Sequence, residues 1–270
     1  MNPDITTNKA EQPQWQVPKY STPLWLGRKH KYCIIIPVIN EGVRIVNLLK
    51  KIGSLKLFSC ADVIIVDGGS TDGSLELEKL EEMGLRGLLI KKGPGKLSSQ
   101  LRCAYAFALR EGYSGVITID GNDKDDPSAI PNFINCLENG YDFIQGSRFL
   151  DGGLGLNTPK VRDFAIRFIH APLLSFSSGF KWTDTTQGFR AYSNKLLRDQ
   201  KISVFRDVFS KYELLAYLSY IAPKLNFKCK EIPTIRRYPA GDMPTKINGL
   251  SGNFEIFSTL LKACLGKYNI

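Results

Sequence analysis

Apolar runs and helix-like apolar spacing alternate along the first half of the chain. Residues 32–38, YCIIIPV, form a continuous apolar run, which is typical of a strand buried on both faces. Apolar residues then recur at helical spacing, at Val43, Val46, Leu49 and Ile52. The alternation continues, and it predicts strands at 32–38, 61–67, 85–92 and 115–120 and helices at 42–55, 74–84 and 96–112.

This order of elements predicts an α/β fold with a mainly parallel sheet and helices on both of its faces. In such sheets, ligands bind beyond the carboxyl ends of the strands. Polar loops follow the first, second and fourth strands, with the sequences PVINEG (37–42), VDGGSTDG (66–73) and IDGNDKDDP (119–127). We therefore expect these three loops to meet at one ligand-binding crevice. Within the second helix, Ser74 is the expected first residue and Gly84 the expected end.

The second half of the chain has a different pattern. It predicts strands at 141–149 and 227–241, helices at 160–178 and 210–225, and a loop that enters a strand at 183–192. Residues 1–28 are rich in Pro, Gln, Asn and Thr, and we expect an extended arm that is docked by its tryptophans. The tail is predicted as an amphipathic helix, with one apolar face formed by Phe254, Phe257, Leu260, Leu261 and Leu265.

The composition predicts an anionic partner. The formal net charge of +10 suits nucleic acid, phospholipid headgroups or phosphorylated small molecules, although a merely soluble basic surface has the same charge. Nucleic acid is disfavoured, because we find no Cys/His finger, no RNP-type aromatic motif and no dense Lys/Arg block. The six cysteines are far apart, which favours reduced thiols in a cytosolic protein. Neither a signal peptide nor an apolar run of about 18 residues is found.

The loop after the fourth strand is the most acidic of the three. Asp120, Asn122 and Asp123 are oxygen donors of the kind that Mg²⁺ or Mn²⁺ prefers, and such a cation would itself bind phosphates. An Asx-rich turn that caps a helix near Pro127 explains the same residues. Lys124 supports a third interpretation, because its ammonium group can neutralise a diphosphate directly.

Asp67 ends the second strand and is followed by Gly68 and Gly69, which permit a ligand to approach the backbone closely. A carboxylate here can accept a hydrogen bond from a ribose hydroxyl or a base N–H. The loop after the first strand lacks a GxGxxG fingerprint, which argues against a nicotinamide dehydrogenase. An ordinary turn would explain DGGSTDG alone, but the two neighbouring loops favour a ligand site.

Charged residues of the second half are further candidates. Arginine forks match phosphate oxygens, and a cluster of them indicates an anionic ligand, although any one of these side chains taken singly is better explained as a solvated surface group. Glu213 and Asp184 are candidate general bases; the alternatives are a favourable charge in the first turn of a helix and a turn former. His170 is interpreted as a core histidine. The candidate cations are Arg148, Arg162, Arg190, Arg236, Arg237 and Lys246.

Taken in order, these motifs resemble those of the family-2 inverting glycosyltransferases of the GT-A fold. Within that family they are most similar to the polyprenyl-phosphate sugar synthases of the dolichol-phosphate mannose synthase type. The resemblance rests on IIIPVINEG, VDGGSTDGS, IDGND and QGSRF, and further along on TDTTQGFRAY, YELL and EIPTIRRYPAG with the later TK. It covers about residues 32–246 and implies one Rossmann-like GT-A domain, with a nucleotide-sugar-binding half at 29–150 and an acceptor-binding half at 151–270.

The resemblance also implies roles for individual residues. Asp120 and Asn122 fill the metal and diphosphate position of the family, with Asp123 as the third metal ligand. The implied donor-binding set is Pro37, Glu41, Asp67, Gly68, Lys96, Asp120 and Asn122. The implied acceptor phosphate-binding set is Arg148, Arg162, Arg190, Arg237 and Lys246, and the catalytic set is Asp120, Lys124, Asp184 and Glu213.

Four positions depart from the family pattern. Asn122 stands where a second carboxylate is usual, and Lys124 stands where a further metal ligand lies. Gly68 replaces the second residue of an Asp-Asp pair, and Ile39 replaces an aromatic residue. Either Asp123 substitutes as a ligand or Lys124 takes over part of the metal's role.

We therefore expect an inverting glycosyltransferase that moves a sugar from a nucleotide-diphosphate donor to a polyprenyl phosphate or other lipid-linked acceptor in cell-surface glycan synthesis. Mg²⁺ or Mn²⁺ is the expected cofactor. The enzyme would be cytoplasmic and bound to the inner face of the membrane through its basic charge and amphipathic tail. The sequence is compatible with a homo-oligomer. One alternative is transfer to a glycan hydroxyl in polysaccharide synthesis, with Glu213 as the base. Another is a non-catalytic nucleotide-binding module in which Asn122 and Lys124 mark a lost metal site.

Overall fold

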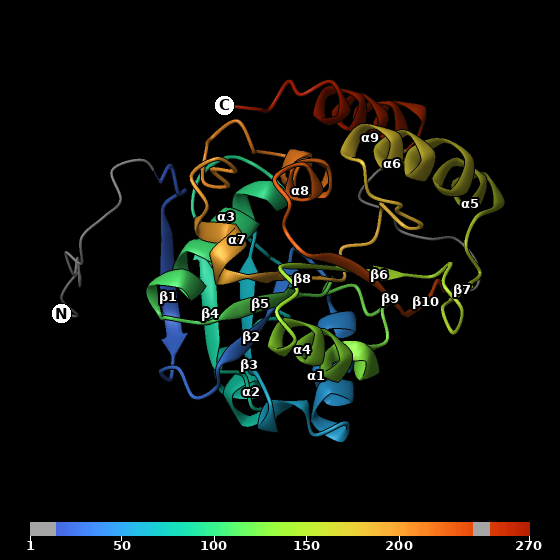
Figure 1. Ribbon diagram of the computed structural model, residues 1–270. Helices are drawn as coiled ribbons and strands as arrows, with labels where there is room; N and C mark the ends of the chain where they lie inside the picture. The colour runs from blue at the N-terminus through green and yellow to red at the C-terminus, as the bar shows by residue number, and fades with distance from the viewer. Residues whose placement is uncertain (1–14, 240–248) are drawn as a thin grey trace.

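An eight-stranded sheet forms the centre of the computed structural model, which describes residues 15–239 and 249–270 (Figure 1). The four inner strands of the first half are mutually parallel, and the two antiparallel members are the first and eighth strands in sequence. The mainly parallel α/β sheet is therefore confirmed. The spatial order is β1 (Tyr20–Trp25), β4 (Gly87–Lys91), β3 (Asp62–Asp67), β2 (Tyr32–Val38), β5 (Gly115–Thr118), β8 (Arg190–Ser193), β6 (Phe143–Ser147) and β9 (Cys229–Pro233).

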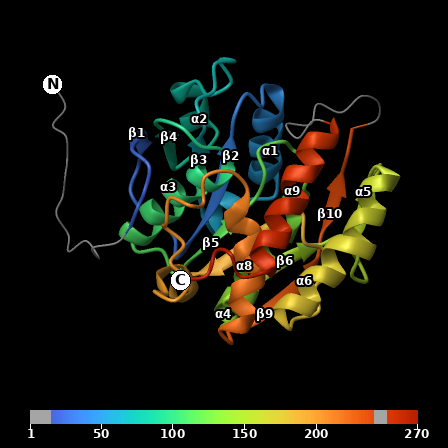
Figure 2. The same ribbon diagram turned by 90° about the horizontal axis from the view of Figure 1, so that it is seen from above.

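Helices cover both faces of this sheet (Figures 1 and 2). Those of the described chain are α1 (Val43–Ser54), α2 (Leu77–Glu82), α3 (Leu97–Arg110), α4 (Ile130–Glu138), α5 (Lys160–Ala165), α6 (Ala171–Ser178), α7 (Asn194–Arg198), α8 (Glu213–Lys224) and α9 (Gly249–Cys264). Short 3-10 turns lie at Leu57–Ser59 and Pro127–Ala129. Helices α1, α2 and α4 share an apolar cluster with one face of the sheet, and α3, α6, α7, α8 and α9 share another with the opposite face.

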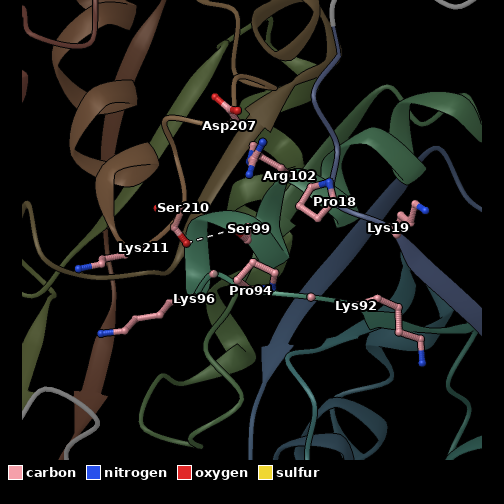
Figure 3. A pocket seen from close by; sticks show the side chains of 12 residues that line it. Pro18, Lys19, Lys92, Pro94, Lys96, Ser99, Arg102, Asp207, Ser210 and Lys211 are labelled. Carbon is pink, nitrogen blue, oxygen red and sulfur yellow. Dashed lines mark hydrogen bonds between the residues drawn. The ribbon is translucent and has the colours of Figure 1, made fainter.

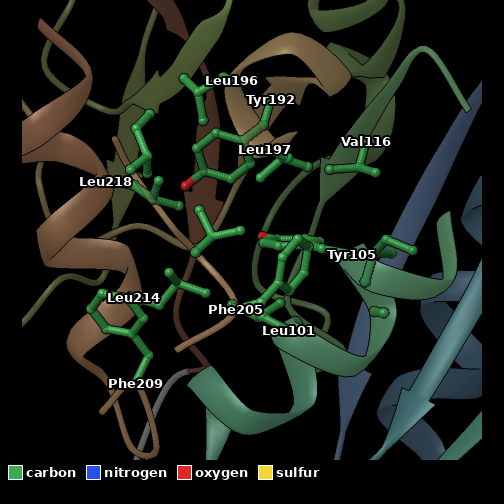
Figure 4. Packing of buried hydrophobic residues seen from close by; sticks show 14 of the residues in the cluster. Leu101, Tyr105, Val116, Tyr192, Leu196, Leu197, Phe205, Phe209, Leu214 and Leu218 are labelled. Atoms are coloured by element: carbon green, nitrogen blue, oxygen red, sulfur yellow. The ribbon is translucent and has the colours of Figure 1, made fainter. Parts of the chain in front are cut away.

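Strand β2 contributes to both of these clusters. Cys33 and Ile35 lie in the cluster with α3 and α8, whereas Ile34 and Ile36 lie in the cluster with α1. Successive side chains of a strand point to opposite faces, so a sheet covered on both sides needs an uninterrupted apolar run. Figure 4 shows the first cluster, in which apolar side chains of α3 and α8 meet.

The predicted apolar face of α1 is partly wrong. Val43 is 69% exposed, and the buried face is formed by Ile45, Leu48, Leu49 and Ile52. These four residues also recur at helical spacing, and the sequence pattern does not distinguish the two overlapping stripes.

The predicted start of α2 is also wrong. The helix begins at Leu77, because Ser74 lies in the preceding turn, where its N–H and hydroxyl donate to Asp72 Oδ1 at 3.1 and 2.7 Å. The predicted end is confirmed, since Gly84 follows the helix with a φ of +91°.

Two predicted elements of the second half are interrupted. The strand expected at 227–241 breaks at Thr234, after which β10 (Ile235–Arg237) leaves the main sheet and pairs in parallel with β7 (Leu154–Leu156). The helix expected at 160–178 contains a π-helical stretch, Ile166–His170, between α5 and α6. The first break brings the arginines of β10 next to the acidic loop.

Both ends of the described chain dock on the domain. Trp15 and Trp25 each pack on a phenylalanine ring, with centroid distances of 4.1 and 4.8 Å, and β1 adds an edge strand that the sequence pattern did not predict. Helix α9 packs against α8 and α6 (Figure 2). On its predicted apolar face Leu260 is buried and Leu265 is 72% exposed, while the side chain of Phe254 lies outside the described residues. No helix in the described ranges has the length and apolar character needed to cross a membrane.

Candidate active site

The ends of β2 and β3 are held together by a buried amide from α3. Gln100 Nε2 donates to the carbonyl oxygens of Val38 at 2.9 Å and Val66 at 3.1 Å, and Gly68 N–H donates to Val38 O at 2.8 Å. A Cβ atom at Gly68 would lie 2.9 Å from Gln100 Nε2, so glycine permits this contact. The two loops predicted to bind the donor therefore leave the sheet side by side.

Asp67 organises the loop that follows it. Its carboxylate accepts from the N–H of Ser70 at 2.9 and 3.0 Å and from the Ser70 hydroxyl at 2.6 Å. The Ser70 hydroxyl in turn accepts from Asn40 N–H at 2.9 Å, which joins this loop to PVINEG. In that loop Glu41 is 7% exposed and pairs with Arg44 at 2.8 Å. These bonds place Asp67 and Glu41 at one edge of the sheet.

Asp120 follows β5 at the same edge, since Gly121 N–H donates to Pro37 O at 3.4 Å. The Asp120 carboxylate accepts from Arg236 Nη2 at 3.3 Å and from Asn122 Nδ2 at 3.5 Å. The side-chain oxygen of Asn122 is already bonded, because Oδ1 accepts from Lys124 N–H at 3.2 Å. Asn122 thus presents its amide N–H toward Asp120, and its side-chain oxygen closes its own turn.

The third predicted metal ligand is held elsewhere. Asp123 has a φ of +57°, and both of its carboxylate oxygens accept from Lys51 Nζ of α1, at 2.8 and 2.9 Å. Of the predicted metal set, the structure brings together Asp120 and Asn122 and not Asp123. Across residues 15–239 and 249–270, no group of three or more His, Cys, Asp or Glu side chains is placed to hold a metal ion. Because Asp123 is bound by Lys51 and the side-chain oxygen of Asn122 accepts from Lys124 N–H, the predicted set offers a divalent cation one carboxylate, Asp120, and fits it poorly.

Asp125 forms a buried network that the sequence did not reveal. It is 2% exposed, accepts from Gln187 Nε2 at 2.6 Å, and forms an ion pair with Arg236 Nη1. Burial raises the pKa of Asp125 although Arg236 opposes this shift, and the charges of Asp125 and Asp120 raise the pKa of Arg236 against the effect of burial. Arg237 N–H also donates to Lys124 O at 2.7 Å. The acidic loop is thereby fastened to β10.

Arg148 and Asp184 form a buried ion pair with each other. Arg148 Nε donates to Asp184 Oδ2 at 2.7 Å and Nη2 donates to Oδ1 at 2.9 Å, while the two side chains are 1% and 0% exposed. Asp184 N–H donates to the Glu231 carboxylate of β9 at 3.0 Å, and this bond anchors the loop that contains Asp184. Asp184 is placed as an anchor, and neither it nor the Arg148 guanidinium faces solvent. The predicted roles of general base and acceptor phosphate ligand do not match this placement.

Three cations surround the ring of Tyr238, and we call Lys124, Arg162 and Arg236 the cationic cluster. Lys124 Nζ, Arg162 Cζ and Arg236 Cζ lie 5.1, 5.9 and 5.6 Å from the ring centroid. In the described part of the chain, Lys124 and Arg162 form no ion pair with a carboxylate. Burial lowers the pKa of both groups, and the neighbouring arginines lower the pKa of Tyr238 against the effect of burial. Two positive charges without an ion-pair partner among the described residues lie beside Asp120, and the three cations of the cluster outnumber the two carboxylates Asp120 and Asp125, which favours an anion.

Arg190, Glu213 and Lys96 lie apart from this cluster. Arg190 is 1% exposed, and its guanidinium donates to the carbonyl oxygens of residues 185, 187 and 215 at 3.0, 2.8 and 2.8 Å, so its predicted role as a phosphate ligand does not fit. Glu213 is the first residue of α8 and accepts from the N–H of residue 211 at 2.6 Å. Lys96 lines a separate cavity of about 650 Å³ at the start of α3 (Figure 3).

Of the two remaining predicted acceptor ligands, one lies in the described part of the chain. Arg237 has an exposed side chain in β10, and Lys246 lies outside the described residues. His170, interpreted as a core histidine, is partly buried beside the Phe257 ring, at a centroid distance of 6.0 Å, and burial lowers its pKa.

Gly188 is a site residue that the sequence pattern did not single out. A Cβ atom at this position would lie 2.4 Å from Asp120 Oδ1, so a side chain here must displace that carboxylate. We expect Gly188→Ala to lower turnover by about 10²-fold, because small displacements of a catalytic group have effects of this size, while the thermal unfolding temperature changes little. Gly53→Ala is the matched control, since its Cβ would meet only Phe58 at 3.5 Å. Wild-type turnover by Gly188→Ala would show that the Asp120 position is unimportant.

Comparison with known proteins gives a family and a fold. The family model described as Glycosyl transferase family 2 matches residues 33–201. The chain is 30% identical over 206 residues to the dolichyl-phosphate hexose transferase of Haloferax volcanii, covering 76% of this chain and 82% of that protein. It is 25% identical over 207 residues to the polyprenol monophosphomannose synthase of Mycolicibacterium smegmatis, covering 74% and 75%. Its fold is similar to that of glucosyl-3-phosphoglycerate synthase from Mycobacterium tuberculosis in complex with Mn²⁺, UDP and glucosyl-3-phosphoglycerate. The TM-score is 0.59 at 16% identity, and the match covers 86% of this chain and 79% of that chain.

Proposed function

Since this chain belongs to glycosyl transferase family 2, we propose that it transfers a sugar from a nucleotide-diphosphate donor to a polyprenyl phosphate, with inversion at the anomeric carbon. The observation that carries the proposal is the pair of cations without an ion-pair partner in the described ranges, Lys124 and Arg162, beside Asp120. An acceptor phosphate and a donor diphosphate are both anionic, and this is the charge that the cationic cluster complements. The names of the relatives, which act on dolichyl and polyprenol phosphates, support the same acceptor class.

In the proposed reaction, the chain binds two anions and needs no general base. A phosphate oxygen of the acceptor forms a bond to the anomeric carbon, the bond from that carbon to the donor diphosphate breaks, and its electron pair leaves with the nucleoside diphosphate. The acceptor oxygen is already ionised, so Glu213 has no proton to remove. Asp67 and Glu41 would bind the nucleoside, and Asp120 and Asn122 would position the sugar and diphosphate. Because the predicted metal set is not assembled, no step is assigned to a divalent cation.

An exposed apolar surface on α5 and the π-helical stretch lies next to this site. Val161, Phe164 and Phe168 are 81%, 57% and 65% exposed, and the two phenylalanine rings are 4.9 Å apart. Arg162 of the same helix belongs to the cationic cluster, and Arg167 lies on this surface in an ion pair with Asp163 at 3.1 Å. Aromatic side chains flanked by arginines bind the interface of an anionic membrane. We propose that this surface binds the cytoplasmic face of the membrane that contains the acceptor.

Transfer to a polyprenyl phosphate in anionic vesicles tests both parts of the proposal. The wild-type chain is expected to give a glycosyl lipid of inverted anomeric configuration from one member of a nucleotide-sugar panel. Phe164→Glu/Phe168→Glu is expected to lower this rate about tenfold or more, because the charges repel the anionic surface, and to leave transfer to a short-chain, water-soluble acceptor unchanged. Equal loss with both acceptors would contradict the membrane assignment. Donor binding without transfer to any acceptor would favour a non-catalytic binding module.

A further inference from the structure

The acidic loop carries fewer available carboxylates than its sequence indicates. Asp123 is bound by Lys51, and Asp125 is buried against Arg236 and Gln187. The ligand oxygen of Asn122 is bonded to the backbone of the same turn. Asp126 caps the following 3-10 turn, where it accepts from Ser128 N–H at 3.0 Å. Among the described residues of this loop, Asp120 is then the carboxylate that pairs with the cationic cluster and is partly exposed.

Positive charge takes the place of these missing ligands. Lys124 Nζ lies 5.1 Å from the centroid of the Tyr238 ring, and the guanidinium carbons of Arg162 and Arg236 lie 5.9 and 5.6 Å from the same centroid, so the three cations gather around one ring. A loop with Asp at position 122 and Gln at position 124 would have a net charge lower by two, because it gains one negative charge and loses one positive charge. Two units of charge are what one Mg²⁺ or Mn²⁺ ion would supply.

We propose that Lys124, supported by Arg236, provides the cationic charge that stabilises the departing diphosphate, so that this chain transfers sugar without a divalent cation. The inference rests on the proposed function and names the group that serves its leaving diphosphate. Lys124 is a catalytic residue in this sense, because its ammonium group contacts the diphosphate oxygens on which negative charge develops. Arg236 is a positioning residue, held by Asp120 and Asp125 at the same place.

The chemistry of the step balances without a metal. The electron pair of the broken carbon–oxygen bond remains on the diphosphate, and the Lys124 ammonium group donates hydrogen bonds to it without giving up a proton.

The test compares transfer and donor binding in EDTA and in Mn²⁺ for four forms of the full chain. Wild type is expected to be equally active in both, within about twofold. Lys124→Gln is expected to lose about 10²-fold in both, as when one preorganised donor to a developing charge is removed. Asn122→Asp/Lys124→Gln is expected to regain activity in Mn²⁺ alone. Lys79→Gln, an exposed lysine of α2 that pairs with Glu76, is the matched control and should behave as wild type.

Calorimetry with UDP and GDP separates the failure of this inference from the failure of the proposed function. If no acceptor is glycosylated in either buffer, the proposed function fails, and the binding data still decide the inference. Nucleotide binding by wild type that is indifferent to Mn²⁺ and is weakened by Lys124→Gln supports it. Wild-type transfer or binding that requires Mn²⁺ would overturn it, and so would the absence of binding in both buffers.

Discussion

Asp120→Ala is expected to abolish sugar transfer while the protein stays folded. Asp120 lies at the carboxyl end of β5, its side chain is 23% exposed, and it holds Arg236 at 3.3 Å beside the cationic cluster. Removing it frees Arg236 to move and takes away the carboxylate proposed to orient the donor, for which we expect a loss of about 10³-fold or more. Arg236 keeps its ion pair with Asp125, so the acidic loop stays attached to β10. The measurements are the transfer rate and the thermal unfolding temperature.

Asp123→Ala is the control for this experiment. Asp123 lies in the same loop, but its carboxylate binds the Lys51 ammonium group, whose side chain is 52% exposed. Its removal should change turnover by no more than a few-fold. Full activity in Asp120→Ala, or equal losses of activity in the two variants, would contradict the assignment of Asp120 to the site.

Arg148→Met is expected to destabilise the protein by about 3–5 kcal/mol, because it leaves the Asp184 carboxylate buried without its partner. Both side chains are almost fully buried, and the hydrogen bonds and charge of Asp184 raise the pKa of Arg148 despite the opposing effect of burial. The free energy of unfolding in urea measures the loss. In Arg148→Met/Asp184→Asn, where the charge is removed as well, part of that loss should be recovered.

Arg237→Met gives the matched comparison, since this arginine lies in an exposed position of β10. We expect it to change the free energy of unfolding by less than about 0.5 kcal/mol. If Arg148→Met is equally mild and instead weakens acceptor binding, then Arg148 is a phosphate ligand after all, as the motif QGSRF implied.

The resemblance implied more arginine ligands than the structure places at the site. Arg148, Arg162 and Arg190 have the same side chain, and each is near a loop in the sequence. The structure buries Arg148 on Asp184, uses Arg190 to bind backbone carbonyl oxygens, and leaves Arg162 beside Tyr238. The role of an arginine depends on which acceptors surround it, and those acceptors come from distant parts of the chain.

The sequence by itself determined the α/β class, the parallel strands at 32–38, 61–67, 85–92 and 115–120, and the edge at which the ligand loops meet. These features follow from local rules: an uninterrupted apolar run such as 32–38 forms a strand covered on both faces, and parallel strands end at one edge. Tertiary structure alone decided which charges remain available. Asp125 pairs with Arg236, which is distant in sequence, and Asp123 pairs with Lys51 of α1. Ion pairs depend on distance in space, and a one-dimensional pattern contains no information on which distant charges will meet.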